Sequence, residues 1–441
     1  MDHPFACPRG VVHDVAHGWE VMEPWLRRNQ PAVEPGSEEL HSHLYRTGQL
    51  LVSKADVSAV RNVLGPRVRT DQEPADDDHT SGCLDELGLA RVWVEEPRNE
   101  DEPPLPALVE QLQQAPRPLR VRLNQVLVSA FHVHVGPATP PRPAGPQEFP
   151  DVPAMSLALA AEATVKVRVL DTGLAADDVI RNQILQGRCD GDPKAAGLST
   201  PLPRSVGHGT FIAGLICRHS NGTRVEVHDV VDECGFIDDV ALCGQLADVP
   251  EDVDLLNLSF GGYGLGGEMV ATVRQLKALA FRNPKLVIVA AAGNDGHDRP
   301  FLPAALPNVI GVAAVERRAD GSLHPACFTN RGPWVDACAV GVDVVSTFPA
   351  FDGELVAVEP PHSCQEPGAS VTAAPTSGTF ADRRARWSGT SFAAPLVTAA
   401  IAQRMTAGRS AREAAYDLLF DPAVQGRRLP GLGVPVEPPA L

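Results

Sequence analysis

From about residue 165 onward, short apolar runs alternate with stretches of helical periodicity. The apolar runs are rich in β-branched residues, which is typical of strands buried on both faces of a parallel sheet. Helical patterns at 211–218 and 269–281 fall between them, so the sequence predicts a doubly wound, mostly parallel α/β sheet. The runs are VKVRVL (165–170), VEVHDVV (225–231), VDLLNLS (253–259), KLVIVAAA (285–292), VIGVAAV (309–315) and VDVVST (342–347).

Upstream of this region, strand and helix patterns alternate in a smaller unit. Together they predict an α+β unit over roughly 45–130. The charged stretch EPADDDHTSG at 73–82 is predicted to be a loop inside it. The expected strands are 50–53, 87–94 and 120–128, and the expected helices are 56–64 and 105–114.

A proline-rich segment separates the two regions. Residues 137–153 hold seven prolines in seventeen positions, and prolines at this density withhold backbone donors from helices and sheets. We therefore expect an extended linker there, between an N-terminal unit at 1–136 and a second domain at 154–441. A stretch rich in Pro, Gly, Ser and Thr at about 348–386 is predicted to be an irregular insertion.

Composition excludes several classes of partner. The 441 residues carry a formal net charge of −17, whereas sequence-independent binding of nucleic acid needs an excess of Lys and Arg. No run approaches the ~20 apolar residues of a membrane span, and the N-terminal residues lack the pattern of a secretory signal. We expect no nucleic-acid partner and no membrane partner.

The cysteines point to a reducing compartment. They are odd in number, widely spaced and without a CxxC pair. In a chain of this length we expect them to be reduced and mostly structural, and hence the protein to be cytoplasmic. The nine are Cys7, Cys83, Cys189, Cys217, Cys234, Cys243, Cys327, Cys338 and Cys364.

Four reactive residue types lie at predicted strand-to-helix junctions. Asp171 follows the first apolar run, His208 opens a helix within GHGT, Asn294 follows VIVAAAG, and Ser391 opens a small-residue helix within SGTS. A Ser hydroxyl needs an adjacent base to become a nucleophile. His208 can supply that base, Asp171 can fix its tautomer, and Asn294 can donate to an oxyanion.

The order Asp, His, Asn, Ser within DTG, GHGT, AAAGN and SGTSFAAP resembles the subtilisin-like (subtilase) family of serine peptidases. The resemblance covers about residues 155–425 and implies a serine endopeptidase acting on peptides or proteins, with Asp171, His208 and Ser391 as triad and Asn294 as oxyanion donor. NLSFGG (257–262) resembles the substrate-binding strand of the family. The implied substrate-binding positions are Ser259, Phe260, Gly261, Ala292 and Gly293.

The sequence departs from the family pattern at a few positions. Phe211 stands where the family often has a second His, GTSFA replaces the commoner GTSMA, and Ala339-Val340-Gly341 replaces APG. No cofactor and no metal site is predicted. Calcium often stabilises subtilases, yet no calcium ligand set can be read from this sequence, and Asp76–Asp78 is predicted to be a solvated loop.

Two other motifs are given structural interpretations. GYGLGG (262–267) satisfies GxGxxG, but the next strand lacks the terminal acidic residue of a dinucleotide site, so its glycines are expected to let a substrate backbone approach. His132 and His134 are predicted to be surface histidines rather than metal ligands.

Three roles stay open for the N-terminal unit: a prodomain-like inhibitor whose end lies in the cleft, a permanent docking domain, or neither. The alternative to an enzyme is a non-catalytic peptide-binding protein on a subtilase fold, held closed by this unit. An α/β-hydrolase esterase is excluded because it needs G-x-S-x-G and the order Ser, Asp, His.

Overall fold

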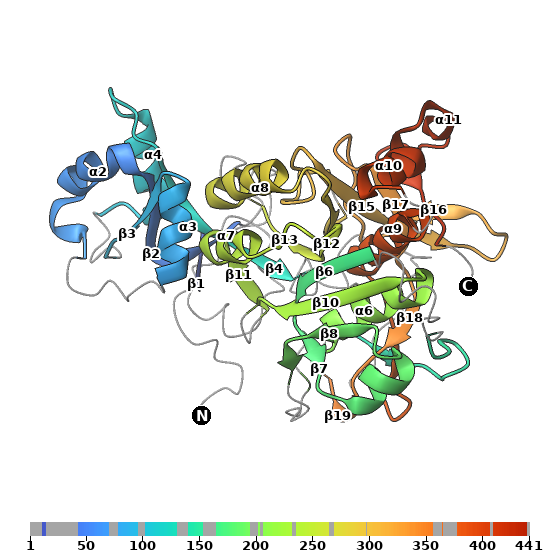
Figure 1. Cartoon of the computed structure of the whole chain (residues 1–441). Coiled ribbons are helices and arrows are strands. Elements are labelled where there is room, and N and C mark those ends of the chain that lie inside the picture. The colour runs from blue at the N-terminus through green and yellow to red at the C-terminus, as the bar shows by residue number, and fades with distance from the viewer. Residues whose placement is uncertain are drawn as a thin grey trace.

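The structure is a computed structural model, whose sheets and helices are drawn in Figure 1. Described residues 11–14 and 43–129 are called the N-terminal unit below, and residues 165–438 the C-terminal domain. The structure describes residues 11–14, 43–69, 78–95, 102–129, 140–152, 165–194, 202, 206–231, 235–263, 269–296, 298–355, 364, 377–405 and 409–438.

A nine-stranded, mostly parallel sheet forms the centre of the C-terminal domain, and five of the six apolar runs lie in it as predicted. The prediction was wrong for the sixth run, 342–347, which lies in the separate antiparallel sheet described below. Its strands are β6 (Val165–Asp171), β8 (Cys189–Gly191), β10 (Thr223–Asp229), β12 (Leu255–Leu258), β14 (Val287–Ala291), β15 (Val309–Arg317), β16 (Leu323–Pro325), β17 (Ala337–Val340) and β22 (Val434–Pro435). Their order is β22-β17-β15-β14-β12-β6-β10-β8, with β16 antiparallel to β15. Since β10 and β12 lie on opposite sides of β6, the carboxyl end of β6 is the switch point where such sheets place their sites.

Helices cover both faces of this sheet. Val165, Val167 and Val169 of β6 pack into the core beneath α6 and α9, whereas Leu170 packs into the core beneath α7 and α8. This alternation is the period-2 pattern of a strand buried on both faces. The helices are α6 (His208–His219), α7 (Asp239–Ala247), α8 (Val270–Arg282), α9 (Thr390–Met405), α10 (Ala411–Ala415) and α11 (Pro422–Gln425), with helical turns η5 (Val179–Ile184) and η8 (Tyr416–Phe420).

Small ladders border the main sheet. β7 (Leu174–Ala175) pairs with β9 (Pro193–Lys194), and β19 (Asp352–Glu354) pairs with β20 (Ser377–Thr379). A further sheet has the order β18 (Val344–Thr347), β21 (Arg384–Trp387) and β5 (Arg142–Pro143). Part of the predicted 348–386 insertion is therefore ordered as strands.

The N-terminal unit is the predicted α+β structure, with helices on an antiparallel sheet and a core that includes Leu50, Val60, Val92 and Leu108. One helix, α3, begins at Asp78 inside the stretch predicted to be a loop. Its buried face carries Cys83 and Leu84, which pack on the C-terminal domain, so a tertiary contact overrides the polar local sequence. The elements are β1 (Val11–Asp14), β2 (His43–Ser53), η2 (Lys54–Asp56), α2 (Val57–Leu64), η3 (Gly65–Arg67), α3 (Asp78–Glu86), β3 (Leu89–Trp93), α4 (Leu105–Gln114) and β4 (Val121–Ser129).

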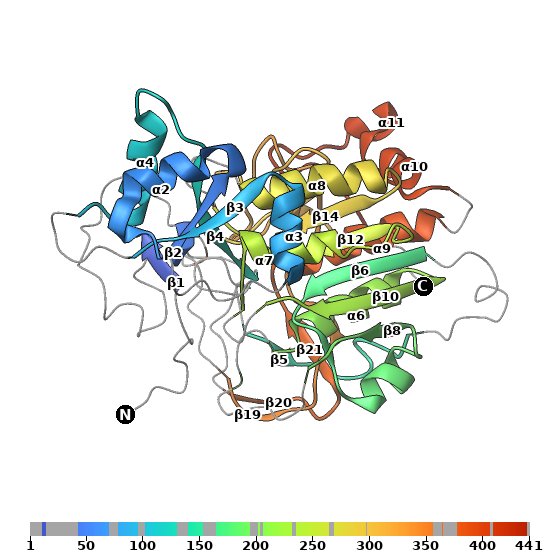
Figure 2. The ribbon, with the colours of Figure 1, turned by 60° about the vertical axis from the view of Figure 1, so that its left-hand side comes forward.

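Strand β4 joins the two parts through backbone pairing. It lies antiparallel to β11 (Phe236–Asp238) and to β13 (Phe260–Gly261), both of which belong to the C-terminal domain. Figures 1 and 2 show α3 of the N-terminal unit beside α7 of the C-terminal domain. The six strands β1, β2, β3, β4, β11 and β13 thus form one sheet across the boundary.

The described part of the proline-rich segment packs on the C-terminal domain. Arg142 and Pro143 pair with β21, and Phe149 and Val152 are buried in the main core. Arg384 Nε donates to the carbonyl of Phe149 at 3.0 Å. Residues 140–152, part of the segment predicted to be an extended linker, are thus anchored on the C-terminal domain through the apolar side chains of Phe149 and Val152. That the segment links two domains stays a prediction.

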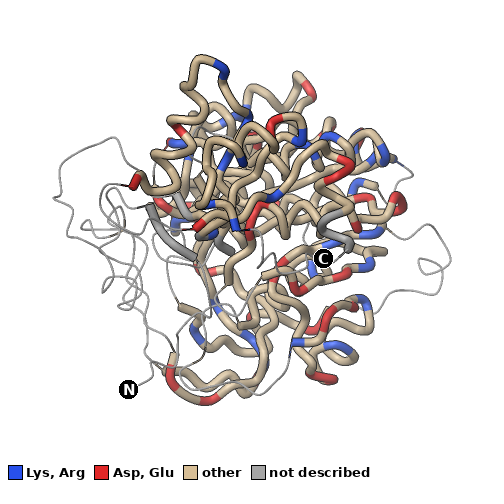
Figure 3. Tube along the Cα trace, turned by 90° about the vertical axis from the view of Figure 1, so that its left-hand side faces the viewer, with Lys and Arg blue, Asp and Glu red and all other residues tan. Residues whose placement is uncertain are grey.

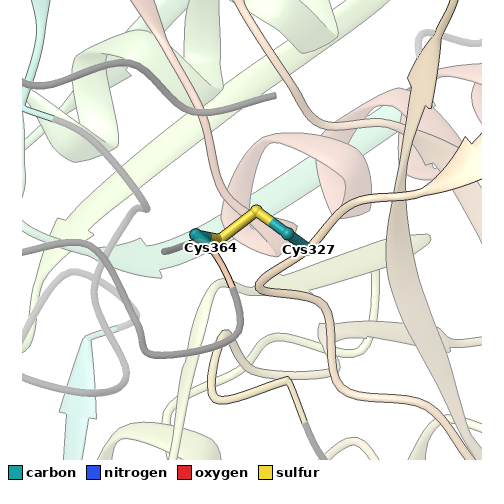
Figure 4. The surroundings of a disulfide bond; sticks show 2 residues. All are labelled: Cys327 and Cys364. Carbon is teal, nitrogen blue, oxygen red and sulfur yellow. A yellow bond between two sulfur atoms is a disulfide. The ribbon is translucent and has the colours of Figure 1, made fainter. Parts of the chain in front are cut away.

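The structure corrects the expectation that the cysteines are all reduced. Cys327 and Cys364 form a disulfide, whose surroundings are drawn in Figure 4. Cys364 lies in the predicted insertion, 37 residues from its partner, so spacing gave no signal for the bond. Cys7 and Cys234 lie outside the described residues. The cysteines no longer support a reducing compartment, and cytoplasmic localisation stays a prediction.

Three further features of the described residues are their distribution of charge, the hydropathy of their helices and their lack of metal-ligand clusters. Figure 3 shows Lys and Arg interspersed with Asp and Glu along the described trace. Within the described ranges, no helix has the length and apolar character needed to cross a membrane. The same residues contain no cluster of three or more His, Cys, Asp or Glu side chains that could hold a metal ion. His132 and His134 lie outside the described residues.

Candidate active site

Asp171 and His208 form a buried pair at the switch point of the sheet. Asp171 ends β6, and His208 is the first residue of α6. His208 Nδ1 lies 2.8 Å from Asp171 Oδ1, and both side chains are 0% exposed. Because an ionised carboxylate only accepts, the pair favours the tautomer in which Nδ1 carries the proton and donates.

Two backbone N–H groups next to this pair are also hydrogen-bonded within the two motifs. Thr172 N–H donates to Asp171 Oδ1 at 2.8 Å, and Gly209 N–H donates to Thr172 Oγ1 at 2.9 Å. A Cβ on Gly209 would lie 2.6 Å from the carbonyl oxygen of Gly173, so α6 can approach β6 this closely only with glycine there. The motif residues beside Asp171 and His208 therefore set the distance between them.

Ser391 lies in the first turn of α9, against the end of β12. Its Oγ donates to the carbonyl of Ser259 at 3.3 Å, and the Ser259 hydroxyl donates to the carbonyl of Ser391 at 3.0 Å. Pro395 explains the second bond. It has no N–H to give the carbonyl four residues earlier in the helix, which is that of Ser391, so the Ser259 hydroxyl satisfies this acceptor.

Aromatic packing brings the Ser391 segment to His208. The ring of Phe392, the next residue after Ser391, lies 5.3 Å from the His208 ring, and Trp387 meets the same ring edge-on at 5.7 Å. Helices α6 and α9 pack against each other along this contact. The predicted triad residues thus lie together at one edge of the sheet, beside the buried rings of Trp387 and Phe392.

Asn294 is oriented by the residue that precedes Ser391. Its Oδ1 accepts the backbone N–H of Thr390 at 2.8 Å and the Thr390 hydroxyl at 2.9 Å. Gly293 N–H donates to the same hydroxyl at 3.2 Å. Thr390, the residue before Ser391, therefore fixes the orientation of the Asn294 amide.

The predicted substrate-binding positions lie beside the nucleophile. Ser259 contacts Ser391, and Phe260 and Gly261 form β13, which pairs with Ser129 and Val128 of β4. Ala292 and Gly293 follow β14, next to Asn294. Phe260 and Ala292 are 0% exposed, so neither side chain is accessible to a peptide.

Sequence reasoning missed several supporting side chains. Thr398 Oγ1 donates to Asn257 Oδ1 at 3.0 Å, and Asn257 Nδ2 donates to Ser259 Oγ at 3.0 Å, which links β12 to α9 behind the nucleophile. The motifs NLSFGG and SGTS, which contain Asn257 and Thr390, could have pointed to these two residues. Thr398 gives no local signal, because its partner is 141 residues away.

A buried carboxyl lies next to Asn294. Tyr263 Oη donates to Asp295 Oδ2 at 2.5 Å, and the Asp295 backbone N–H donates to Asn330 Oδ1 at 3.0 Å. Asn330 Nδ2 also donates to the carbonyl of Ala292 at 2.9 Å. Burial raises the pKa of Asp295 to about 7, against hydrogen bonds from Tyr263 and Asn330 that lower it.

We expect Asp295 to make the free energy of unfolding fall as pH rises from about 4 to about 7. The unfolded carboxyl has a pKa near 3.8, and the folded one keeps its proton to about 7. The stabilisation is therefore complete below the unfolded pKa and is lost as pH rises through the folded one, at up to about 1.4 kcal/mol per pH unit. Urea unfolding of Ser391→Ala protein at a series of pH values measures this slope.

Asp295→Asn in the same background is expected to flatten the slope. Asp239, whose pKa burial raises to about 6, and Asp336, whose pKa burial also raises, titrate in both proteins and contribute to the remaining dependence. Equal slopes with and without Asp295 would contradict this assignment.

Comparison with known proteins identifies the family. A family model described as the subtilase family matches residues 162–416, more than half of the chain. A thermophilic serine proteinase of Bacillus sp. (strain AK1) is 32% identical over 158 residues, which cover 32% of this chain and 35% of that protein. An intracellular serine protease of Paenibacillus polymyxa is 30% identical over 224 residues, covering 45% and 64%.

The fold has a solved counterpart. The crystal structure of fervidolysin from Fervidobacterium pennivorans, a keratinolytic enzyme related to subtilisin, matches with a TM-score of 0.53 at 19% identity. This match covers 89% of the present chain and 60% of that one. The chain spans less than two thirds of the length of each of these three relatives. The family match, together with the fold, shows that this chain belongs to the subtilase family.

Proposed function

We propose that this chain is a serine endopeptidase that hydrolyses peptide bonds through an acyl-enzyme on Ser391. The observation that carries the proposal is the buried Asp171–His208 pair, 2.8 Å apart, packed against the segment that holds the Ser391 hydroxyl. Relatives named as serine proteinases in Bacillus and Paenibacillus support it.

The mechanism follows from the tautomer of His208. With Nδ1–H donating to Asp171, Nε2 accepts the Ser391 proton as Oγ attacks the scissile carbonyl, and it then protonates the leaving amine. Water attacks the acyl-enzyme in the second half, with the same nitrogen as base. Asp171 stabilises the imidazolium that forms in both halves.

The negative oxygen of the tetrahedral intermediate is assigned to two donors. The backbone N–H of Ser391 lies in the first turn of α9, where amide groups have no helical acceptor and the helix dipole favours negative charge. Asn294 supplies the second donor, with its amide oriented by Thr390. No metal or cofactor is needed for these steps.

We also propose that the N-terminal unit occupies the substrate edge and is cut there by the site. β4 lies between β11 and β13 as a peptide would when it adds as an antiparallel strand. Ser129, the last residue of β4, is opposite Phe260, which directly follows Ser259, the residue whose carbonyl accepts the Ser391 hydroxyl. We expect cleavage at or next to the Ala130–Phe131 bond.

Intact mass spectrometry of the purified chain under denaturing, reducing conditions tests both proposals. The wild-type chain is expected to separate into two fragments that meet at or beside Ala130–Phe131, and Ser391→Ala protein is expected to stay whole. Two intact proteins, with no hydrolysis of added peptides by either, would favour the non-catalytic peptide-binding alternative. Cleavage that persists in Ser391→Ala would exclude self-processing by this site.

Substrate selection is proposed to favour a small side chain before the scissile bond. Phe301 is fully buried and packs behind both substrate segments: a Cβ on Gly261 would lie 2.2 Å from its Cε1, and one on Gly293 would lie 3.0 Å from its Cγ. The ring therefore fills the space between them. Ala130, at the proposed cleavage site, is itself small.

Phe301→Ala is expected to raise kcat/KM for substrates with Phe before the scissile bond relative to those with Ala, by about tenfold or more. One or two methylene-sized groups in an apolar site change selectivity by about 10–200-fold. Phe380→Ala is the matched control, since Phe380 is equally buried but packs on Phe348 and Phe351. An unchanged selectivity ratio in Phe301→Ala, at retained activity, would refute the assignment.

A further inference from the structure

Cys83 and Cys243 bring two sulfur atoms together across the junction of the two parts. Cys83 lies on α3 of the N-terminal unit, and Cys243 lies on α7 of the C-terminal domain, 160 residues later. Their Sγ atoms are 2.8 Å apart. Non-bonded carbon atoms, which are smaller than sulfur, pack best at about 3.5–4.0 Å. The two sulfurs are thus closer than packing alone explains.

We propose that Cys83 and Cys243 form a disulfide, and that this bond keeps the N-terminal unit attached to the C-terminal domain after the chain between them is cut. The first half of the proposal stands on the sulfur geometry alone. The second half rests on the self-cleavage proposed above.

The surrounding packing holds both cysteines in place. Cys83 is 7% exposed and Cys243 is 0% exposed. The apolar cluster around them draws from both parts of the chain, so the sulfurs meet at a packed interface and not between loops. Its other buried members are Leu51, Leu84, Leu89, Val240 and Ala271.

Polar contacts around the cluster fix the same interface. Arg46 pairs with Asp238 at 2.8 Å, and Asn124 Nδ2 donates to Asp238 Oδ1 at 3.2 Å. Arg274 Nη1 donates to the carbonyl of Leu87 at 2.7 Å. Each bond joins the N-terminal unit to the C-terminal domain. A pair of thiols held this way has a high effective concentration, so the second step of disulfide formation is favoured.

The chemistry balances with a dissolved disulfide as oxidant, such as oxidised glutathione. The thiolate of one cysteine attacks the dissolved disulfide and releases one thiol. The other cysteine then attacks the resulting mixed disulfide and releases the second thiol, so two protein thiols are oxidised while one disulfide is reduced to two thiols. The Cys327–Cys364 bond shows that this chain already accommodates a disulfide.

Burial affects the rate of exchange. The neighbouring thiol and burial raise the pKa of Cys243, so Cys243 is a poor leaving group when a reductant attacks the bond. We expect reduction of the bond to be slow in the folded protein and fast once the interface is unfolded.

A second close pair offers an internal comparison. Cys189 Sγ and Cys217 Sγ are 2.9 Å apart, but β8 and α6 both belong to the C-terminal domain. A bond between them would leave the N-terminal unit free to separate. Cys338, buried in β17, takes part in neither close pair nor the disulfide and is the control position.

Disulfide mapping tests the first half without any variant or any cleavage by the site. Full-length Ser391→Ala protein, purified without reductant, is alkylated with iodoacetamide in denaturant and digested with an unrelated protease. We expect a cross-linked peptide pair that contains Cys83 and Cys243, and alkylated Cys338. Alkylation of both Cys83 and Cys243 as free thiols, after incubation with oxidised glutathione, would overturn the proposal.

Denaturing electrophoresis of the wild-type chain tests the second half. Cleaved protein is expected to run as one species without reductant and as two fragments with it. Cys83→Ser is expected to give two fragments in both conditions, and Cys338→Ser is expected to behave like wild type. Two fragments from cleaved wild type without reductant would refute retention. If the chain is never cleaved, the self-processing proposal fails alone, since the mapping result stands by itself.

Discussion

Replacing Ser391 with alanine is expected to lower kcat by about 10⁶-fold on any peptide that the wild-type chain hydrolyses, as in subtilisin, where removal of the nucleophile has this effect. In the proposed mechanism the hydroxyl oxygen of Ser391 forms the acyl bond, and no neighbouring group can replace it. The hydroxyl of Ser259, a neighbouring side chain, donates to the carbonyl of Ser391 at 3.0 Å. A fluorogenic peptide assay at saturating substrate measures the change.

Ser388→Ala is the matched control for this variant. Ser388 is buried in the same SGTS motif, but its hydroxyl accepts the backbone N–H of Asp343 at 2.9 Å and lies outside the triad. We expect near-wild-type kcat there, with a loss of about 1 kcal/mol in stability from the missing hydrogen bond. A comparable loss of kcat in both variants would mean that the Ser391 effect is structural.

Asp171→Asn is expected to lower kcat by about 10⁴-fold while leaving the fold intact. The amide nitrogen of asparagine can donate to Nδ1 of His208, which selects the tautomer that carries its proton on Nε2. That nitrogen can then no longer accept the Ser391 proton. The effect depends on the 2.8 Å contact between two fully buried side chains, where water cannot restore the tautomer.

The pH profile separates this explanation from a loss of structure. We expect residual activity of Asp171→Asn to rise at high pH, where hydroxide can take over proton removal, with an unchanged thermal midpoint. Asp177→Asn is the control. Asp177 lies six residues after Asp171 in sequence and forms a salt bridge with Arg383 at 2.6 Å, whereas His208 is hydrogen-bonded to Asp171. Equal losses in both variants would contradict the tautomer argument.

Most of the sheet could be predicted because its strands are encoded locally. The runs 165–170 and 309–315 correspond to β6 (Val165–Asp171) and β15 (Val309–Arg317) within one or two residues, since burial on both faces demands continuous apolar sequence. The positions of Asp171, His208 and Ser391 followed from the rule that sites lie at the carboxyl ends of such strands, combined with motif order.

Features that depend on distant partners could not be predicted in this way. The pairing of β4 with β13 joins residues far apart in the chain, and neither strand carries a mark of its partner. Helix α3 gains its stability from Cys83 and Leu84 packing on α7 and α8. The Cys327–Cys364 bond was missed because an odd, dispersed set of cysteines is ambiguous without coordinates.

Covalent labelling with a fluorophosphonate tests the central claim most directly, because the reagent reacts only with a serine whose proton is removed by a neighbouring base. Peptide mapping after labelling of the native wild-type chain, once its N-terminal unit has been cut and the bond to it reduced, is expected to place the phosphonyl group on Ser391. Labelling is expected to be absent from urea-unfolded wild type and from a His208→Ala chain that an added protease has cut after β4, so that its site is equally open. A label on another residue, or equal labelling of Ser391 in the His208→Ala chain, would contradict the claim that Asp171, His208 and Ser391 act as one unit.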